Sequence, residues 1–203
     1  VKHGQSFKTM AITINGNGTV TGVSVGGLPD GIVDTDMLAA DAVTAPKIGS
    51  KTFTSYAIIG DVKANDVDGG TFTEGAWYTR DLNTELADPD GIVSISSNKF
   101  TLQAGTYFIE ASAPAYKVNR HMAKLYQTSG TQADIAFGTS MYANNTNLVN
   151  TVSVVRARVT ISTATDYEIR HQGDSTNATY GYGLGSNFGT TELYTVVQIY
   201  KEA

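Results

Sequence analysis

The chain has 203 residues, a hydrophobic content of 41% and a formal net charge of −5. This length fits one domain with an appendage, and the hydrophobic content is enough for a core. The acidic balance without a basic run excludes an ordinary nucleic-acid binder, and the absence of cysteine excludes disulfides and thiol or cysteine–zinc chemistry. The 21 glycines and the abundance of Thr, Ser and Asn predict an all-β chain rich in turns. No apolar run reaches the roughly 18 residues of a membrane-spanning helix, so we expect no membrane insertion.

The first 27 residues contain a strong hairpin signal. Apolar residues alternate on both sides of Asn15–Gly18, with Ile12 and Ile14 before it and Val20 after it. Asn-Gly pairs tolerate positive φ and are typical of tight hairpin turns. Because strands this short are not stable alone, they need partner chains. We therefore predict that residues 1–27 form a β-hairpin that anchors the chain.

A ten-residue repeat follows the hairpin. Ile32–Leu38 recurs as Ala42–Ile48, and each copy has a valine, a capping residue and one short helical turn. One turn buries almost nothing alone, but turns from three chains around a threefold axis would bury their apolar side chains. We predict that residues 28–50 form a short stalk, and the alternative is a plain interdomain linker. The stalk residues would be Val33, Leu38, Val43 and Ile48.

Residues 51–203 predict a separate head in which short strands alternate with polar loops. No segment has a convincing helical pattern, and many short strands bounded by turn residues are typical of a β-sandwich. The expected strands are 54–62, 76–82, 92–95, 98–103, 105–113, 117–127, 133–138, 150–162, 165–172 and 192–201.

The strand at 150–162 has the clearest alternation. Arg156 and Arg158 share one face, so we expect that face to point outward. The opposite face is the predicted core face, with Ser153, Val155, Ala157, Val159 and Ile161.

The strand at 192–201 is apolar on both faces. An antiparallel strand with one wet face should alternate apolar and polar residues, and this one does not. We therefore expect the face of Val197 and Ile199 to pack inside the sandwich and the other face to meet neighbouring subunits. The alternative is that loops of the same chain cover it. The predicted trimer-interface residues are Tyr194, Val196 and Tyr200.

Ser97–Ala113 reads as a strand, an Ala104-Gly105 hairpin turn and a second strand. It resembles the signature of the globular heads of complement component one-q and tumour necrosis factor, which joins two strands of a trimeric jelly roll. Segments in the same order resemble further strands of that family, namely Tyr56–Gly60, Trp77–Asn83, Val118–Tyr126 and Thr163–Ile169, where Thr165 replaces the usual glycine. The resemblance implies a homotrimeric, ten-stranded jelly-roll head.

Residues 28–44 resemble stalk segments of bacteriophage fibre and spike proteins. This resemblance implies a structural protein of the virion surface, held to capsid or tail proteins by its N-terminal region. The head would then belong to a tail fibre or spike that binds a host surface glycan, or to a head fibre or decoration (cement) protein on the capsid exterior. The short stalk favours the second role. The alternative is a secreted or cellular complement-like trimeric binding module without a virion role.

The sequence predicts no enzyme and no cofactor. His121 and His171 have the inward phase of their strands, so we expect hydrogen-bonded core residues and not catalytic bases. A nucleophile elbow, a phosphate loop and a His-x-x-x-His pair are all absent from the sequence. Paired carboxylates such as Asp134 and Glu168 are the glycan-cleaving alternative.

Two loops, 141–147 and 173–188, are rich in Tyr, Asn, Ser and Gly and are candidate binding loops. Tyrosine offers a rigid amphipathic surface and asparagine adaptable hydrogen bonds, which also suits sugars. The alternative is that they are glycine-rich connections whose tyrosines pack on the sandwich or between subunits. The candidate ligand-binding residues are Tyr142, Asn144, Asn145, Asn177, Tyr180, Tyr182 and Phe188.

The segment 61–70 clusters oxygen ligands that suit calcium, from Asp61, Asp66 and Asp68. It lacks the spacing and the closing Glu of a full calcium loop. Turn formation next to glycine explains the same residues, so the main prediction is that the head holds no metal.

Overall fold

The computed structural model describes residues 13–14, 20–21 and 52–202, and the chain divides into two compact units, 1–49 and 50–203. In the first unit, β1 (Thr13–Ile14) and β2 (Val20–Thr21) pair antiparallel, as the Asn-Gly signal between them predicts. The stalk prediction lies outside the described residues, with Val33, Leu38, Val43 and Ile48.

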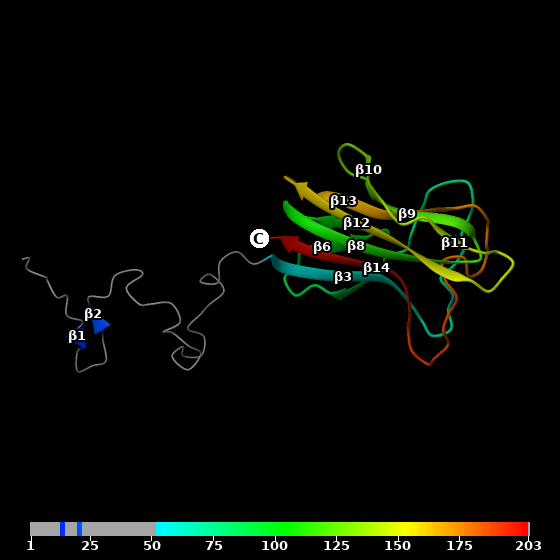
Figure 1. Cartoon of the computed structure of the whole chain (residues 1–203), viewed down its shortest axis with the longest axis horizontal. Coiled ribbons are helices and arrows are strands. Elements are labelled where there is room, and N and C mark those ends of the chain that lie inside the picture. Colours follow the sequence, from blue (N-terminus) through cyan, green and yellow to red (C-terminus); the bar gives the residue numbers. More distant parts are fainter. Residues whose placement is uncertain (1–12, 15–19, 22–51, 203) are drawn as a thin grey trace, which may run out of the picture. The chain divides into compact units, whose positions relative to one another are not determined.

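The second unit is an all-β head (Figure 1), and its described residues contain no helix. Each of the ten predicted segments contains a strand, and the alternation missed two short ones, β5 and β11. The strands are β3 (Phe53–Lys63), β4 (Tyr78–Thr79), β5 (Thr84–Ala87), β6 (Val93–Ser96), β7 (Lys99–Leu102), β8 (Gly105–Tyr116), β9 (Asn119–Gln127), β10 (Ala133–Phe137), β11 (Met141–Ala143), β12 (Asn150–Ile161), β13 (Thr165–Gly173) and β14 (Glu192–Glu202).

Two antiparallel sheets form a sandwich. One has five strands in the order β12-β8-β14-β3-β5, and Figure 1 shows the first four side by side across the head. The other has seven strands, with the path β10-β9-β13-β7-β6, while β11 pairs with β9 and β4 with β13. Strands far apart in sequence are neighbours in both sheets, as a jelly roll requires. The predicted all-β jelly-roll sandwich is therefore confirmed, and the described head residues form twelve strands where ten were predicted.

Alternation along each strand builds the core. On β12 the predicted core face is buried at Ser153, Val155, Ala157 and Val159, while the arginines of the other face are exposed. Aromatic rings fill the space between the sheets, with Phe100 and Tyr167 stacked 5.7 Å apart between ring centroids. Large side chains that are almost fully excluded from solvent include Ile59, Leu82, Leu102, Tyr107, Ile109, Leu125, Ile169 and Ile199.

The connection at Ala104-Gly105 differs from the prediction. β7 pairs with β6 and β13, whereas β8 pairs with β12 and β14, so the two strands belong to different sheets. Ala104-Gly105 is therefore a crossing between the sheets and not a hairpin, and Gly105 has a φ of 156° there. The two-residue hairpin lies earlier, at Ser97 and Asn98, where both residues have positive φ and Ser96 pairs with Lys99.

Within the part of the chain that the structure describes, no helix is long and apolar enough to cross a bilayer.

Candidate functional site

The outer face of the five-stranded sheet carries several large apolar side chains. Cross-strand register aligns Phe108, Tyr200 and Tyr56 in one row, and Phe53 packs its ring 5.2 Å from that of Tyr200. Further along β14, Val196 pairs with Gly60. We call this surface the apolar face; its members are Phe53, Tyr56, Phe108, Val196 and Tyr200, with Leu86 and Leu193 flanking Gly60.

Two ion pairs border the apolar face along β12. Arg156 contacts Glu110 at 2.5 Å, and Arg158 donates two hydrogen bonds to Glu202 at 2.8 and 2.7 Å. The hydrogen bonds that Arg158 donates to Glu202 raise the pKa of Arg158 and lower the pKa of Glu202. An apolar centre beside a border of both charge signs is the usual composition of a protein interface.

Tyr194 does not lie on the apolar face, so its predicted position is wrong. The pairing of β14 with β3 shifts register between Leu193 and Val196, and this irregularity exchanges the faces. Tyr194 is therefore 6% exposed and donates a hydrogen bond to the carbonyl of Val67 at 2.7 Å, while Leu193 is 49% exposed. Val196 and Tyr200 keep the predicted orientation.

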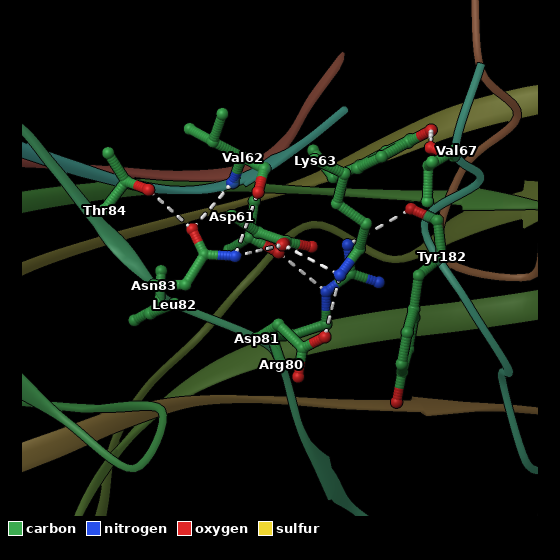
Figure 2. Close-up of polar contacts among 12 residues, drawn as sticks. Asp61, Val62, Lys63, Val67, Arg80, Asp81, Leu82, Asn83, Thr84 and Tyr182 are labelled. Carbon is green, nitrogen blue, oxygen red and sulfur yellow. Dashed lines mark hydrogen bonds and ion pairs between the residues drawn. The ribbon is translucent and has the colours of Figure 1, made fainter. Parts of the chain in front are cut away.

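The interior contains an arginine that sequence reasoning did not find. Arg80 is fully buried, and its guanidinium donates to Oγ1 of Thr195 at 2.8 Å and to the carbonyls of Pro114 and Tyr182 at 3.1 and 3.2 Å. Its guanidinium carbon also lies 3.9 Å from the centroid of the Tyr182 ring (Figure 2). Burial lowers the pKa of Arg80 to about 10. Arg80 thus ties three segments of the head together by hydrogen bonds to neutral groups.

The calcium alternative does not agree with the structure. Figure 2 shows Asp61 engaged with Lys63 and Asn83, at 3.1 Å from each side-chain nitrogen. Asp68 accepts a hydrogen bond from the Gly185 amide at 3.0 Å. Among the described residues, no three His, Asp or Glu side chains lie close enough to hold a metal ion. Asp61, Asp66 and Asp68 therefore do not form a cluster that could hold calcium: Asp61 binds side chains beside β3, and Asp68 binds the backbone of a distant loop.

Both strand histidines are interior, as predicted. Nδ1 of His121 lies 2.9 Å from Nε2 of His171, and Nε2 of His121 lies 2.7 Å from Oγ1 of Thr151. Burial, together with the charge of Arg80, lowers the pKa of His121 to about 4 and that of His171 well below its usual value. Both imidazoles are thus neutral at pH 7, and Nδ1 of His171 has no hydrogen-bond partner among the described residues.

The two carboxylates of the glycan-cleaving alternative have separate structural partners. Oδ1 of Asp134 contacts Nζ of Lys124 at 2.5 Å. Glu168 is buried, pairs with Arg170 and accepts a hydrogen bond from Oγ1 of Thr79 at 2.9 Å. Each carboxylate therefore forms its own ion pair on the seven-stranded sheet, and the two are not engaged with a common partner.

The asparagines among the predicted ligand-binding residues make hydrogen bonds within their own loop or to neighbouring segments of the head. Oδ1 of Asn144 accepts hydrogen bonds from the amides of residues 146 and 147, at 2.8 and 2.9 Å. Asn177 donates to the carbonyl of Tyr116 at 3.0 Å, and Nδ2 of Asn145 donates to Oγ of Ser175 at 3.2 Å. Asn145, Asn177 and Tyr180 line one shallow pocket of about 310 Å³.

Three aromatic residues among the predicted ligand-binding residues lie in three different parts of the head. Tyr182 packs against Arg80 and Phe72 and contributes to the interior instead of to a loop surface. Phe188 is 85% exposed at the tip of a loop that Glu192 holds. The amides of residues 186 and 187 donate to the Glu192 carboxylate and lower its pKa to about 2. Tyr142 lines a groove of about 570 Å³.

Sequence reasoning did not predict this groove as a whole. Trp77, Met122 and Gln172 line it together with Tyr142, although these residues come from separate segments of the chain. The alternation of β9 indicates that Met122 points outward, but only the strand pairing shows that Gln172 lies beside it. The seven predicted ligand-binding residues therefore do not form one site.

Comparisons with known proteins agree with this architecture. No protein-family model matches the sequence, and none of the curated proteins does. Among solved structures, murine APRIL at pH 5.0 superposes with a TM-score of 0.50 at 6% identity, over 72% of this chain and 98% of that one. The head is a jelly roll similar in fold to murine APRIL.

Two further structures are similar to this chain. The globular domain of zebrafish complement 1qA has a TM-score of 0.46 at 16% identity and covers 72% of this chain and 95% of its own. Eiger TNF from S. frugiperda has a TM-score of 0.47 at 11% identity, and the match covers 75% of this chain and 94% of its own. At these identities the likeness concerns the fold alone.

Proposed function

We propose that the chain is a non-enzymatic surface protein whose jelly-roll heads associate as a homotrimer and display their loops outward. The apolar face carries this proposal. Phe53, Tyr56 and Leu193 are each more than 40% exposed there in the single chain. Exposed apolar side chains gathered on one sheet face mark a candidate site of association. The polar pair of Gln198 and Glu110 lies between the row of Tyr200 and that of Val196, so the apolar side chains form two groups on this face.

A second copy of the chain is the partner that this face fits best. The ion pairs of Arg156 and Arg158 place both charge signs at the border of this surface, so a neighbouring copy does not meet a border of one charge sign. The sequence resemblance to trimeric heads supports three copies. Association would bury the row of Tyr56, Phe108 and Tyr200, and each Å² of apolar area removed from water stabilises by roughly 25 cal/mol.

We further propose that the trimer stands on a virus particle. The repeat at 32–49, which resembles phage stalk segments, supports this location. The N-terminal hairpin would contact capsid or tail proteins, and the heads would project as a decoration or fibre knob. A secreted or cellular complement-like module is the second candidate, and the head alone fits it equally well.

Light scattering on the full chain tests the oligomer. We expect three times the protomer mass for the native protein, and a monomer for Tyr200→Asp and Val196→Asp, because each substitution places a carboxylate within the apolar face. Ser94→Asp is the matched control, since Ser94 is an exposed residue of β6 in the other sheet. A native monomer, or trimers that both interface variants leave intact, would reject association through this face.

Immunogold imaging of purified particles tests the virion role separately. Label on the capsid supports decoration, and label on the tail supports a fibre. A trimer that is absent from particles would reject the virion role and favour the complement-like alternative.

A further inference from the structure

The groove that contains Tyr142 lies on the outer face of the seven-stranded sheet. Along β9, Arg120 and Met122 point outward while His121 and Ala123 point inward, so one strand supplies both the floor of the groove and its buried support. Register places Gln172 of β13 beside Met122 and Tyr142 of β11 beside Arg120. The segment before β4 adds Trp77.

Of the two aromatic side chains in the groove, Trp77 is packed against neighbours and Tyr142 is exposed to solvent. Trp77 is held in place, because Nζ of Lys124 lies 4.3 Å from its ring centroid and the Phe137 ring lies 6.0 Å away. Tyr142 is 53% exposed and is free to cover a ligand. One fixed indole and one exposed phenol provide flat apolar surfaces on which the C–H face of a sugar ring can stack.

The polar side chains match hydroxyl groups. Gln172 offers both a donor and an acceptor, Arg120 offers up to five N–H donors, and Asp174 offers acceptors only. Arg120 and Asp174 pair at 3.3 Å, and both are more than half exposed, so solvent screens the pair and a ligand can compete for it. A sugar hydroxyl both donates and accepts, so it can bind each of these groups.

The size and the charge of the groove lining indicate which ligands fit. The volume of about 570 Å³ is in the range of small-molecule sites. Arg120 and Asp174 cancel each other's charge, and His121 is neutral because burial lowers its pKa to about 4. The lining therefore has no net charge and does not favour a phosphate or another anion. Asp174 is the single carboxylate among the lining residues, whereas glycoside cleavage generally needs two.

We propose that this groove binds a neutral hexose unit of a glycan without cleaving it. The proposal deepens the proposed function and rests on it, because it gives the display head a ligand class and a site. The groove and the apolar face lie on the outer surfaces of opposite sheets, so association through the apolar face leaves the groove open. The site is built from Trp77 and Tyr142 as stacking surfaces and from Gln172, Arg120 and Asp174 as hydrogen-bonding partners.

An array of oligosaccharides with neutral hexose termini, and their sialylated counterparts, tests the full-length chain. We expect binding to at least one neutral terminus, followed by measurement of its affinity by calorimetry. Tyr142→Ala should weaken that affinity at least about tenfold, a change of one decade in Kd. Gln172→Ala should also weaken the affinity, and this variant tests the hydrogen bonds because it removes no aromatic ring.

Two variants distinguish this groove from the other loop surfaces. Phe188→Ala removes an exposed aromatic ring that does not line the groove. Tyr180→Ala removes a ring from the shallow pocket of Asn145 and Asn177. Both should bind like the native chain. No binding to any neutral glycan, binding to sialylated probes alone, or equal loss in Tyr180→Ala and Tyr142→Ala would overturn the proposal. Light scattering on the same samples reports the trimer independently, so failure of the groove and failure of the proposed function are separable.

Discussion

Nδ1 of His121 lies 2.9 Å from Nε2 of His171, and both rings are buried between the two sheets. The pair shares one hydrogen bond, and the charge of buried Arg80 helps to keep both rings neutral. A second proton on either ring would place a cation near the Arg80 cation in a region that solvent barely reaches. The interior of this head is therefore built for neutral histidines.

Stability should consequently fall as the pH is lowered from 7 to 5. Histidines of the unfolded chain take up protons near their ordinary pKa of 6.5, whereas the pKa of folded His121 is lowered to about 4. Because the unfolded state binds more protons in this window, the free energy of unfolding drops by about 2 kcal/mol per histidine by pH 5. Urea titrations at the two pH values measure this loss.

His121→Gln provides the control for this effect. The variant has one titrating group fewer, so its loss between pH 7 and 5 should be about half that of the native chain. Most unfolded carboxylates titrate below pH 5 and contribute little in this window. Equal unfolding free energies of the native chain at pH 7 and 5 would contradict neutral, buried histidines.

Arg80→Lys should destabilise the head by about 2–4 kcal/mol. Lysine has a single charged nitrogen and cannot reach Thr195, Pro114 and Tyr182 together, so buried acceptors lose their donor. Arg120→Lys is the matched control, since its side chain is 82% exposed and should change stability by less than about 0.5 kcal/mol. Equal thermal midpoints for the two variants would show that the Arg80 hydrogen bonds contribute nothing.

The alternation of side chains explains why so much of the fold could be predicted. From Val155 to Ile161, β12 alternates apolar and polar residues, and a shift of one residue in its pairing would expose the whole apolar set to solvent. The same reasoning failed on β14, because a register irregularity before Val196 changes the phase without any signature in the residue types. Hydrophobic pattern locates a strand, but not the residue at which its pairing slips.

The candidate sites were harder to predict for a different reason. Trp77, Met122 and Gln172 lie in one groove through the pairing of strands whose order in the sheet is not encoded locally. Composition indicated Tyr142, which lines the groove, but it also indicated Asn144, which stabilises its own loop, and Tyr182, which packs in the interior. An asparagine that caps a turn and one that binds a ligand have the same local sequence signal.

Gly181→Ala should cost about 2 kcal/mol or more. A Cβ at this position would lie 2.3 Å from Cβ of Phe72 and 2.8 Å from the carbonyl of Asn177, and backbone atoms cannot move aside cheaply. In Gly185→Ala the nearest atoms lie at 3.6 Å, so that variant should be neutral within about 0.5 kcal/mol. Chemical denaturation compares the two. Equal stability would mean that the 173–188 loop is not packed on the sandwich as described.

Tyr194→Asp and Tyr200→Asp should fail in different ways. Tyr194 packs its ring against Gly183, where an added Cβ would lie 2.4 Å from the ring, and its hydroxyl binds Val67. Replacing it by aspartate removes a buried aromatic ring, at a cost of about 3–5 kcal/mol, and buries a carboxylate as well. We therefore expect Tyr194→Asp to lose its folded circular dichroism spectrum. Tyr200→Asp changes the apolar face and should give a folded head that is monomeric by light scattering. A folded, monomeric Tyr194→Asp protein would instead restore Tyr194 to the subunit interface.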